Sequence, residues 1–160
     1  MKHFKSALAT TCLTLLINGA MAHESTCGAI TVAHAHASPT LGELKVGAVY
    51  FKGITNKGKQ ADQLLGARTT AAVKVEIHEM AMEGDVMKMR AVPNLPIPAG
   101  QTVSLAQGQH NGHHVMLMGL SKPLKEGDKF PITLKFKRAG ACQAEVWVEA
   151  PKAEADAHQH

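Results

Sequence analysis

Short runs of alternating apolar and polar residues, separated by turn residues, constrain the fold of this chain more than any other feature. The run at residues 71–78 alternates cleanly, so one face of a strand there would carry Val73, Val75 and Ile77. Its opposite face would carry Lys74, Glu76 and His78. Further runs are found at residues 28–36, 46–55, 86–91, 102–105, 114–120, 132–137 and 145–148. No amphipathic helix pattern accompanies them, so the sequence predicts an all-β sandwich or barrel.

Proline and glycine punctuate these runs. Three prolines, Pro93, Pro96 and Pro98, interrupt the chain before a turn at Ala99 and Gly100. Residues 62–67 are expected to form a short linker, and residues 107–112 a polar loop. The last two runs are expected to pair as a hairpin around residues 139–141.

The first 22 residues have the pattern of a secretory signal peptide. Lys2 and Lys5 precede an apolar run at residues 7–17, and a small-x-small cleavage pattern ends at Ala22. The apolar run is shorter than the roughly 20 residues that span a bilayer. We therefore expect a periplasmic protein with one β domain at residues 23–150, no transmembrane segment in the mature chain, and a disordered tail containing histidine at residues 151–160.

Charge argues against nucleic acid as a partner. Removing Lys2 and Lys5 leaves 15 basic residues against 13 acidic ones. No basic run with interleaved aromatic residues remains, so nucleic-acid binding is not expected.

Two of the three cysteines remain after the leader. Cys27 and Cys142 are expected to pair in an oxidising compartment, although a thiolate metal site is the alternative. Such a bridge would tie the first strand to the last and contribute about 4 to 5 kcal/mol by the chain-entropy estimate. Lipid attachment at Cys27 is disfavoured, because residues 24–26 are too polar for a lipidation motif.

Methionine and histidine gather in one window, residues 78–118, which holds four His and all six Met outside the leader. Thioether and imidazole ligands together suit a soft cation, above all Cu(I). The alternative is that Met fills the core. Alternation argues against it, because Val115 and Leu117 form the apolar face of their strand. The residues left on the other face are His114, Met116 and Met118. Met80 and Met82 would share the face of His78 if that strand continues.

Patterns typical of enzymes are missing from the sequence. We find no nucleophile elbow, no HExxH motif and no pair of catalytic carboxylates. A blue-copper centre would need a Cys ligand with His and Met close by, and Cys142 has none. The sequence therefore predicts a binding protein and not an enzyme.

Four segments resemble the periplasmic PCu(A)C family of copper chaperones: residues 75–80, 86–90, 97–100 and 114–120. The resemblance implies a cupredoxin-like Greek-key β-barrel. It also implies Cu(I) ligands at His78, Met89, His114 and Met116. The function it implies is delivery of copper to the copper centre of cytochrome c oxidase subunit II, or to another periplasmic copper protein.

The chain departs from the family pattern before its last motif. There are 24 residues between Met89 and His114, three more than is usual in the family, and the extra residues fall at 107–113. They leave His113 and His114 as competing ligands, of which alternation with Met116 favours His114. Auxiliary sites, including sites for Cu(II), are expected at His110, His113, His158 and His160. These extra His and Met residues keep open a second function, storage of several copper ions for resistance.

Overall fold

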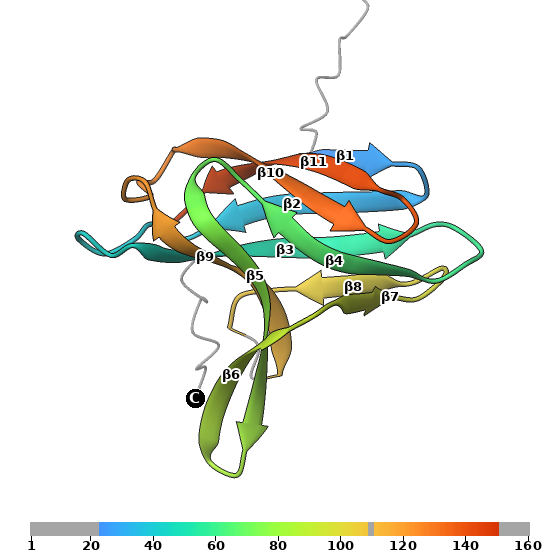
Figure 1. The fold of residues 1–160 in the computed structure, drawn as a ribbon, viewed down its shortest axis with the longest axis horizontal. Helices are drawn as coiled ribbons and strands as arrows, with labels where there is room; N and C mark the ends of the chain where they lie inside the picture. Colours follow the sequence, from blue (N-terminus) through green and yellow to red (C-terminus); the bar gives the residue numbers. More distant parts are fainter. Residues whose placement is uncertain (1–22, 109–110, 151–160) are drawn as a thin grey trace, which may run out of the picture.

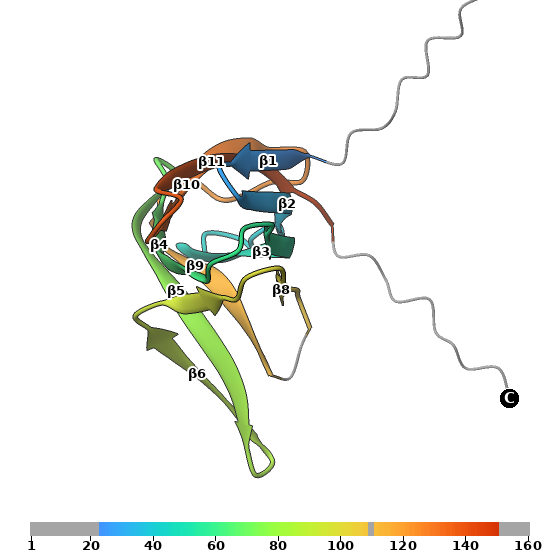
Figure 2. The same cartoon turned by 90° about the vertical axis from the view of Figure 1, so that its right-hand side faces the viewer.

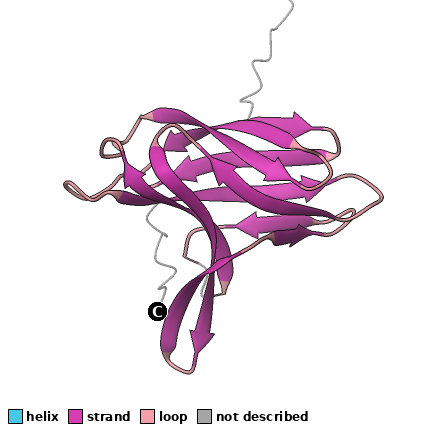
Figure 3. Ribbon diagram, in the orientation of Figure 1, coloured by secondary structure: helices cyan, strands magenta, loops and turns pink. Residues whose placement is uncertain are grey.

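In the computed structural model of the protein, residues 23–108 and 111–150 are described, and they form one eleven-stranded sheet (Figures 1 and 3). This described part contains no helix. The predicted leader and the predicted tail lie outside it. The strands are β1 (Glu24–Cys27), β2 (Ile30–Ala37), β3 (Val46–Asn56), β4 (Asp62–Arg68), β5 (Ala72–Glu83), β6 (Val86–Val92), β7 (Leu95–Ile97), β8 (Thr102–Leu105), β9 (Gly112–Leu120), β10 (Lys129–Phe136) and β11 (Ala141–Val148).

The sheet rolls up around one core. Its strand order is β6-β5-β9-β3-β2-β11-β10-β4-β7, with β1 paired to β2 and β8 paired to β3. Strand β7 ends the order, yet a short turn leads from it to β8, which returns to β3 near the middle. The two halves of the sheet therefore face each other, and β2 and β11 form the parallel pair that joins them. The all-β, cupredoxin-like fold expected for the chain is confirmed.

Alternation predicts the core side of β9 correctly, because Val115 and Leu117 are both fully buried. On β5 the predicted core side is correct for Ile77, which is 3% exposed, and wrong for Val73, which is 90% exposed. Val73 lies at the start of β5, close against Gly119, where an added Cβ would lie only 3.0 Å from the Cβ of Val73. The strand enters the core only beyond this point.

The prediction of a linker at residues 62–67 is wrong, because these residues belong to β4. Asp62 fixes the start of that strand. Its buried carboxylate accepts the backbone N–H groups of Gln63, Arg138 and Ala139 at 2.7, 2.8 and 2.9 Å. Strand β4 is thereby attached to the turn between β10 and β11.

The proline-rich stretch also contains a strand, β7, although it was expected to be irregular. Leu95 and Ile97 are buried on either side of exposed Pro96. Proline is tolerated there because β7 ends the sheet order and pairs only with β4.

Cys27 and Cys142 form a disulfide that joins β1 to β11, with Cα atoms 5.5 Å apart. The pairing agrees with the expectation from the sequence. Cys142 is fully buried within the core, and partly buried Cys27 packs against it. Among the described residues, no helix is long and apolar enough to cross a membrane.

A long hairpin projects from the rolled sheet. Strand β5 pairs with β9 as far as Met80 and then continues to Glu83, where β6 is its only partner among the described strands. The β5–β6 hairpin consequently extends beyond the body of the molecule (Figures 1 and 2). Most of β6 is exposed.

Candidate metal centre

The outward faces of β6, β5 and β9 form one continuous surface, because β5 pairs antiparallel with both of the other strands. Residues directly opposite each other in such pairs project from the same face. His78 of β5 lies opposite His114 of β9, and Glu76 lies opposite Met116. The histidines that lead the two sequence clusters are therefore direct cross-strand neighbours.

Four methionines continue this face along the β5–β6 hairpin. Met80 lies opposite Met89, and Met82 lies opposite Met87. Residues two apart in a strand share a face, so Met80 and Met82 are in phase with His78. The sequence predicts this shared face only if the strand continues beyond His78. Strand β5 does continue, to Glu83.

The two imidazoles lie close together below the surface. Their ring centroids are 5.7 Å apart, and His114 is 4% exposed. The Nδ1 atoms of both His78 and His114 are buried and have no hydrogen-bond partner among the described residues. Because buried polar atoms are nearly always paired, two unpaired nitrogens on adjacent rings call for an explanation. A bound cation would supply it.

Glu76 determines which nitrogen of His78 is available. Its Oε2 lies 3.0 Å from Nε2 of His78, and its Oε1 lies 2.6 Å from Nζ of Lys74. Hydrogen bonds from Lys74 and from His78 hold the pKa of Glu76 below its ordinary value, so the carboxylate is ionised and can only accept. Nε2 of His78 must therefore carry the shared proton. In a neutral ring this leaves the lone pair on Nδ1, free to bind a metal.

His114 is held as a neutral ring. Burial lowers the pKa of His114, and protonation of the neighbouring His78 or His113 would lower it further. On the side away from His78, the ring of Tyr50 lies 6.0 Å from it, and burial raises the pKa of that tyrosine. A neutral imidazole is the form that binds metal ions.

The two methionines expected to bind Cu(I) occupy different positions relative to the histidine pair in the sheet. Met116 follows His114 by two residues on the same face and lies opposite Glu76, next to the histidine pair. Met89 lies across β5 from β9, opposite Met80. Met80, which is not in the expected set, lies between Met89 and the histidine pair in the register of the strands.

The available donors are soft. In the part of the chain that the structure describes, no group of three or more His, Cys, Asp or Glu side chains is placed to hold a metal ion. Two imidazole nitrogens with thioethers on the same face suit Cu(I), since thioethers bind soft cations without losing a proton.

His113 lies on the opposite face of β9. It is the cross-strand neighbour of Glu79, and its Nε2 is 3.9 Å from Oε1 of that residue. Glu79 also accepts a hydrogen bond from Nε of Arg90 at 2.9 Å. Of the two competing histidines, His114 is therefore the one on the face of His78. The other proposed auxiliary residues, His110, His158 and His160, lie outside the described residues.

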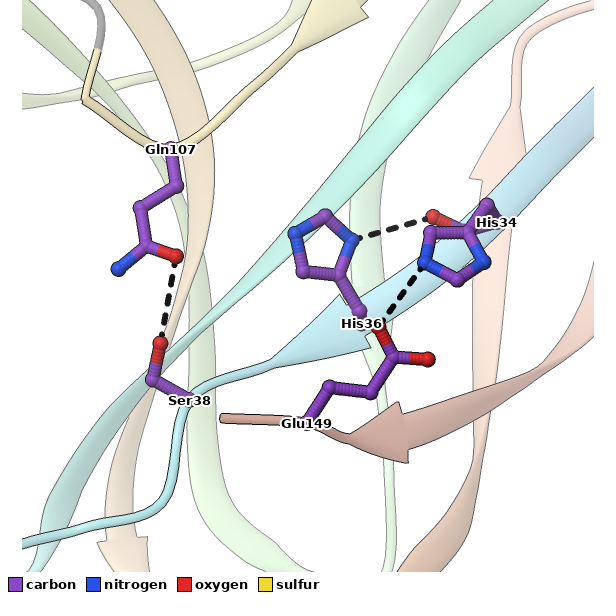
Figure 4. Close-up of polar contacts among 5 residues, drawn as sticks. All are labelled: His34, His36, Ser38, Gln107 and Glu149. Carbon is purple, nitrogen blue, oxygen red and sulfur yellow. Dashed lines mark hydrogen bonds and ion pairs between the residues drawn. The ribbon is translucent and has the colours of Figure 1, made fainter. Parts of the chain in front are cut away.

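A second group of histidines lies on β2 (Figure 4). Nε2 of His34 is 3.1 Å from Oε2 of Glu149, and Nδ1 of His36 is 3.4 Å from the carbonyl oxygen of His34. The ring of His36 lies 5.7 Å from that of Tyr50, so a row of rings leads from β2 to His114. Beside them, Ser38 donates to Oε1 of Gln107 at 3.3 Å and attaches the loop after β8 to the end of β2.

Two residues of this surface have no assigned role in the sequence-based prediction, Glu76 and Tyr50. Glu76 could have been found, because it precedes His78 by two residues and so shares its face. Nothing in the sequence points to Tyr50. Its contact with His114 depends on β3 and β9 being neighbours, which only the folded sheet reveals.

Comparison with known proteins places these observations in context. Residues 30–148 match the family model described as LpqE-like. A curated relative from Leifsonia xyli subsp. xyli, "Putative lipoprotein Lxx21020", is 38% identical over 87 residues. That match covers 54% of this chain and 51% of the relative, so the chain spans about half the length of that protein.

Solved structures with the same fold include copper proteins. The structure named "Copper-bound PCuAC domain from PmoF2" is 25% identical, with a TM-score of 0.65, and the match covers 81% of this chain and 99% of that one. "Apo PCuAC domain from PmoF1" is 26% identical, with a TM-score of 0.67, covering 81% and 100%. The solution structure of CuI-DR1885 from Deinococcus radiodurans is 32% identical, with a TM-score of 0.60, covering 84% and 85%.

Proposed function

This chain belongs to the LpqE-like family, and on that premise we propose that it is a periplasmic carrier of Cu(I). The proposed ligands are His78, Met89, His114 and Met116. One observation carries the proposal: the buried Nδ1 atoms of two adjacent histidines have no hydrogen-bond partner within the described part of the chain, and they lie on a face that also carries thioethers. Similarity to structures whose names include bound copper supports Cu(I) as the cargo.

The proposed ligand set suits an ion that has to be handed on. All four ligands are neutral, so no ligand needs to be protonated or deprotonated when the ion enters or leaves. The ligands project from the outward face of the sheet and not into its closed core. An acceptor can therefore approach Met89, which is 53% exposed, and displace the ligands one at a time.

The acceptor we propose is the copper centre of cytochrome c oxidase, as the resemblance to the PCu(A)C family implies, with another periplasmic copper protein as the alternative. The leader at residues 1–22, the domain at residues 23–150 and the tail at residues 151–160 remain parts of this proposal. The tail and the loop with His110 are proposed to capture Cu(II).

X-ray absorption on the Cu(I)-loaded protein tests the ligand set. We expect a first shell with both nitrogen and sulfur, two atoms of each. A shell made only of nitrogen and oxygen would contradict the proposal, because it would leave out both Met89 and Met116.

Storage of several copper ions is the second candidate function. The observation that favours it is the presence of thioethers beyond the four proposed ligands, at Met80, Met82 and Met87. Transfer separates the two functions. A carrier passes its ion to an apo acceptor on mixing, whereas a storage protein keeps several tightly held ions and passes none.

A further inference from the structure

Three methionines of the β5–β6 hairpin are left over once the proposed Cu(I) ligands are assigned. Met82 lies opposite Met87 near the hairpin tip, and Met80 lies opposite Met89 one step closer to the histidine pair. All four share one face, so the hairpin carries a ladder of two thioether pairs. The hairpin that carries this ladder projects from the body of the molecule (Figures 1 and 2).

The exposure of these side chains argues against a packing role. Met82 is 38% exposed and Met87 is 49% exposed. Methionine in a core fills gaps between buried neighbours, but β6 is exposed along almost its whole length. An outer strand with apolar side chains also invites aggregation, so such side chains call for a purpose.

The opposite face of the hairpin has ordinary surface chemistry. Lys88 pairs with Glu83 there, and Arg90 binds Glu79 through Nε at 2.9 Å and through its terminal nitrogen at 2.8 Å. Charged residues and methionines are therefore sorted onto two separate faces. Between Met80 and Met89, the described strand residues on the methionine face are all uncharged.

Cross-strand geometry brings three of the sulfur atoms within reach of one ion. Directly opposed Cβ atoms are about 5 Å apart, and diagonal neighbours about 7 to 8 Å. Met82 and Met87 are directly opposed, and Met80 is diagonal to Met87. Each side chain has three rotatable bonds beyond Cα and can turn its sulfur toward a common point.

We propose that Met80, Met82 and Met87 form a second, outer site for a soft monovalent cation, Cu(I) or Ag(I), at the hairpin tip. The proposal rests on the proposed function for its direction: an ion held there lies next to the inner site. Met80 is the link, because it belongs to the outer site and also lies opposite the inner ligand Met89. The ion moves by exchange of one neutral thioether for another, with no change of oxidation state and no proton released.

A hydrogen bond connects the proposed outer site to the segment just before β9. The backbone N–H of Met82 donates to Oδ1 of Asn111 at 3.1 Å. Asn111 directly precedes β9, whose His114 belongs to the inner site. The residue that leads into the inner histidine strand thereby holds the outer methionine strand in place.

Titration with Ag(I), a stand-in for Cu(I) that does not change oxidation state, tests the outer site in protein labelled with ¹³C at its methionine methyl groups. We expect the first equivalent to shift the methyl signals of Met89 and Met116. The second should shift those of Met80, Met82 and Met87. In the Met82→Leu/Met87→Leu variant, the second equivalent should bind at least about tenfold more weakly while the first is unchanged. Leucine keeps the apolar surface and removes only the sulfur.

Two further variants separate the outer site from the inner one. Met118→Leu removes a thioether from the same face of β9, away from the hairpin and opposite Lys74, and should keep both binding events. In His78→Ala/His114→Ala the inner event should disappear and the hairpin signals should still shift. If the first equivalent in the wild type misses Met89 and Met116 while the hairpin responds, the proposed inner ligands fail and the outer site stands. A second equivalent that leaves the hairpin signals unmoved, or binds equally well to the Met82→Leu/Met87→Leu variant, overturns the outer site.

Discussion

Glu76 connects the charged surface of β5 to the proposed metal ligands. A carboxylate that accepts the N–H of a metal-binding histidine fixes the orientation of the ring and raises its basicity. Here the carboxylate is itself held by Lys74, so Lys74, Glu76 and His78 form a line along one strand face. Met116 lies opposite Glu76 and completes the surroundings of the histidine.

Replacing Glu76 by Gln should therefore weaken Cu(I) binding without removing a ligand. Loss of such an outer partner typically costs about 10- to 100-fold in metal affinity, and we expect an effect of this size in competition with a Cu(I) chelator. Glu83→Gln is the matched control, since Glu83 lies on the same strand but pairs with Lys88 on the hairpin. Equal affinities for wild type and Glu76→Gln would mean that Glu76 does not orient His78.

Removing a proposed ligand should lower the Cu(I) affinity more than replacing Glu76, which only orients one of the ligands. Met89→Ala or Met116→Ala should weaken binding of the first Cu(I) by about a hundredfold or more, beyond the range of about 10- to 100-fold for loss of an outer partner. Met82→Ala should change that first binding event far less, because Met82 belongs to the outer pair with Met87. Similar losses at all three positions, measured by the same chelator competition, would refute the inner ligand set.

At the scale of the element, strand β5 does most of the positioning. It pairs with β9 on one side and with β6 on the other, so one strand places ligands from all three. Its length matters as well, because the part beyond Met80 has only β6 as a partner and forms the projecting hairpin. A shorter β5 would keep the histidine pair and lose the second pair of methionines.

Alternation along single strands allows much of this to be predicted. It places His78 with Glu76, and His114 with Met116, away from Ile77, Val115 and Leu117. The register between strands cannot be predicted in this way, because it depends on turn geometry and on neighbours distant in the sequence. The position of Met80 between Met89 and the histidines follows from register alone. The burial of His114 likewise depends on strand β3 and Tyr50.

The strand at residues 62–67, which the sequence did not predict, also depends on contacts with residues distant in the sequence. Gly66 and the two leucines in sequence break the alternating pattern, so local propensity is weak there. What makes β4 a strand is tertiary: the carboxylate of Asp62 accepts three backbone N–H groups, two of them from the turn after β10. Burial raises the pKa of Asp62, but these hydrogen bonds and the charge of Arg138 outweigh it and leave the pKa below its usual value.

Asp62→Asn should lower the free energy of unfolding by about 1 to 3 kcal/mol at pH 7, the usual cost of losing hydrogen bonds to a buried charge. Because the folded state lowers this pKa, the stabilisation is complete above the ordinary value near 3.9 and is lost as the pH falls below it. The difference in unfolding free energy between wild type and Asp62→Asn, measured in urea, should therefore become smaller below about pH 4. Asp85→Asn, at an exposed turn residue, serves as the control. A gap that stays constant down to pH 3 would assign the effect to packing and not to charge.

At the scale of the whole molecule, the disulfide and the proposed metal ligands lie in different parts of the sheet. The disulfide joins β1 to β11, while the proposed ligands lie on β6, β5 and β9. Strands β3 and β2 separate β9 from β11 in the strand order. The ligand face is thus attached to a core whose covalent link is several strands away.

This separation predicts that the disulfide can be removed without affecting Cu(I) binding. The bridge spans 115 residues, so Cys27→Ala/Cys142→Ala should lose up to about 4 to 5 kcal/mol of unfolding free energy by the chain-entropy estimate. Distant sites couple by only about 0.3 to 0.5 kcal/mol, so Cu(I) affinity should stay within about twofold while the variant is folded. Urea unfolding and chelator competition on the same preparation measure both quantities. A variant that remains folded but binds Cu(I) tenfold more weakly would contradict the separation, because it would mean that the bridge sets the geometry of the β5–β9 face.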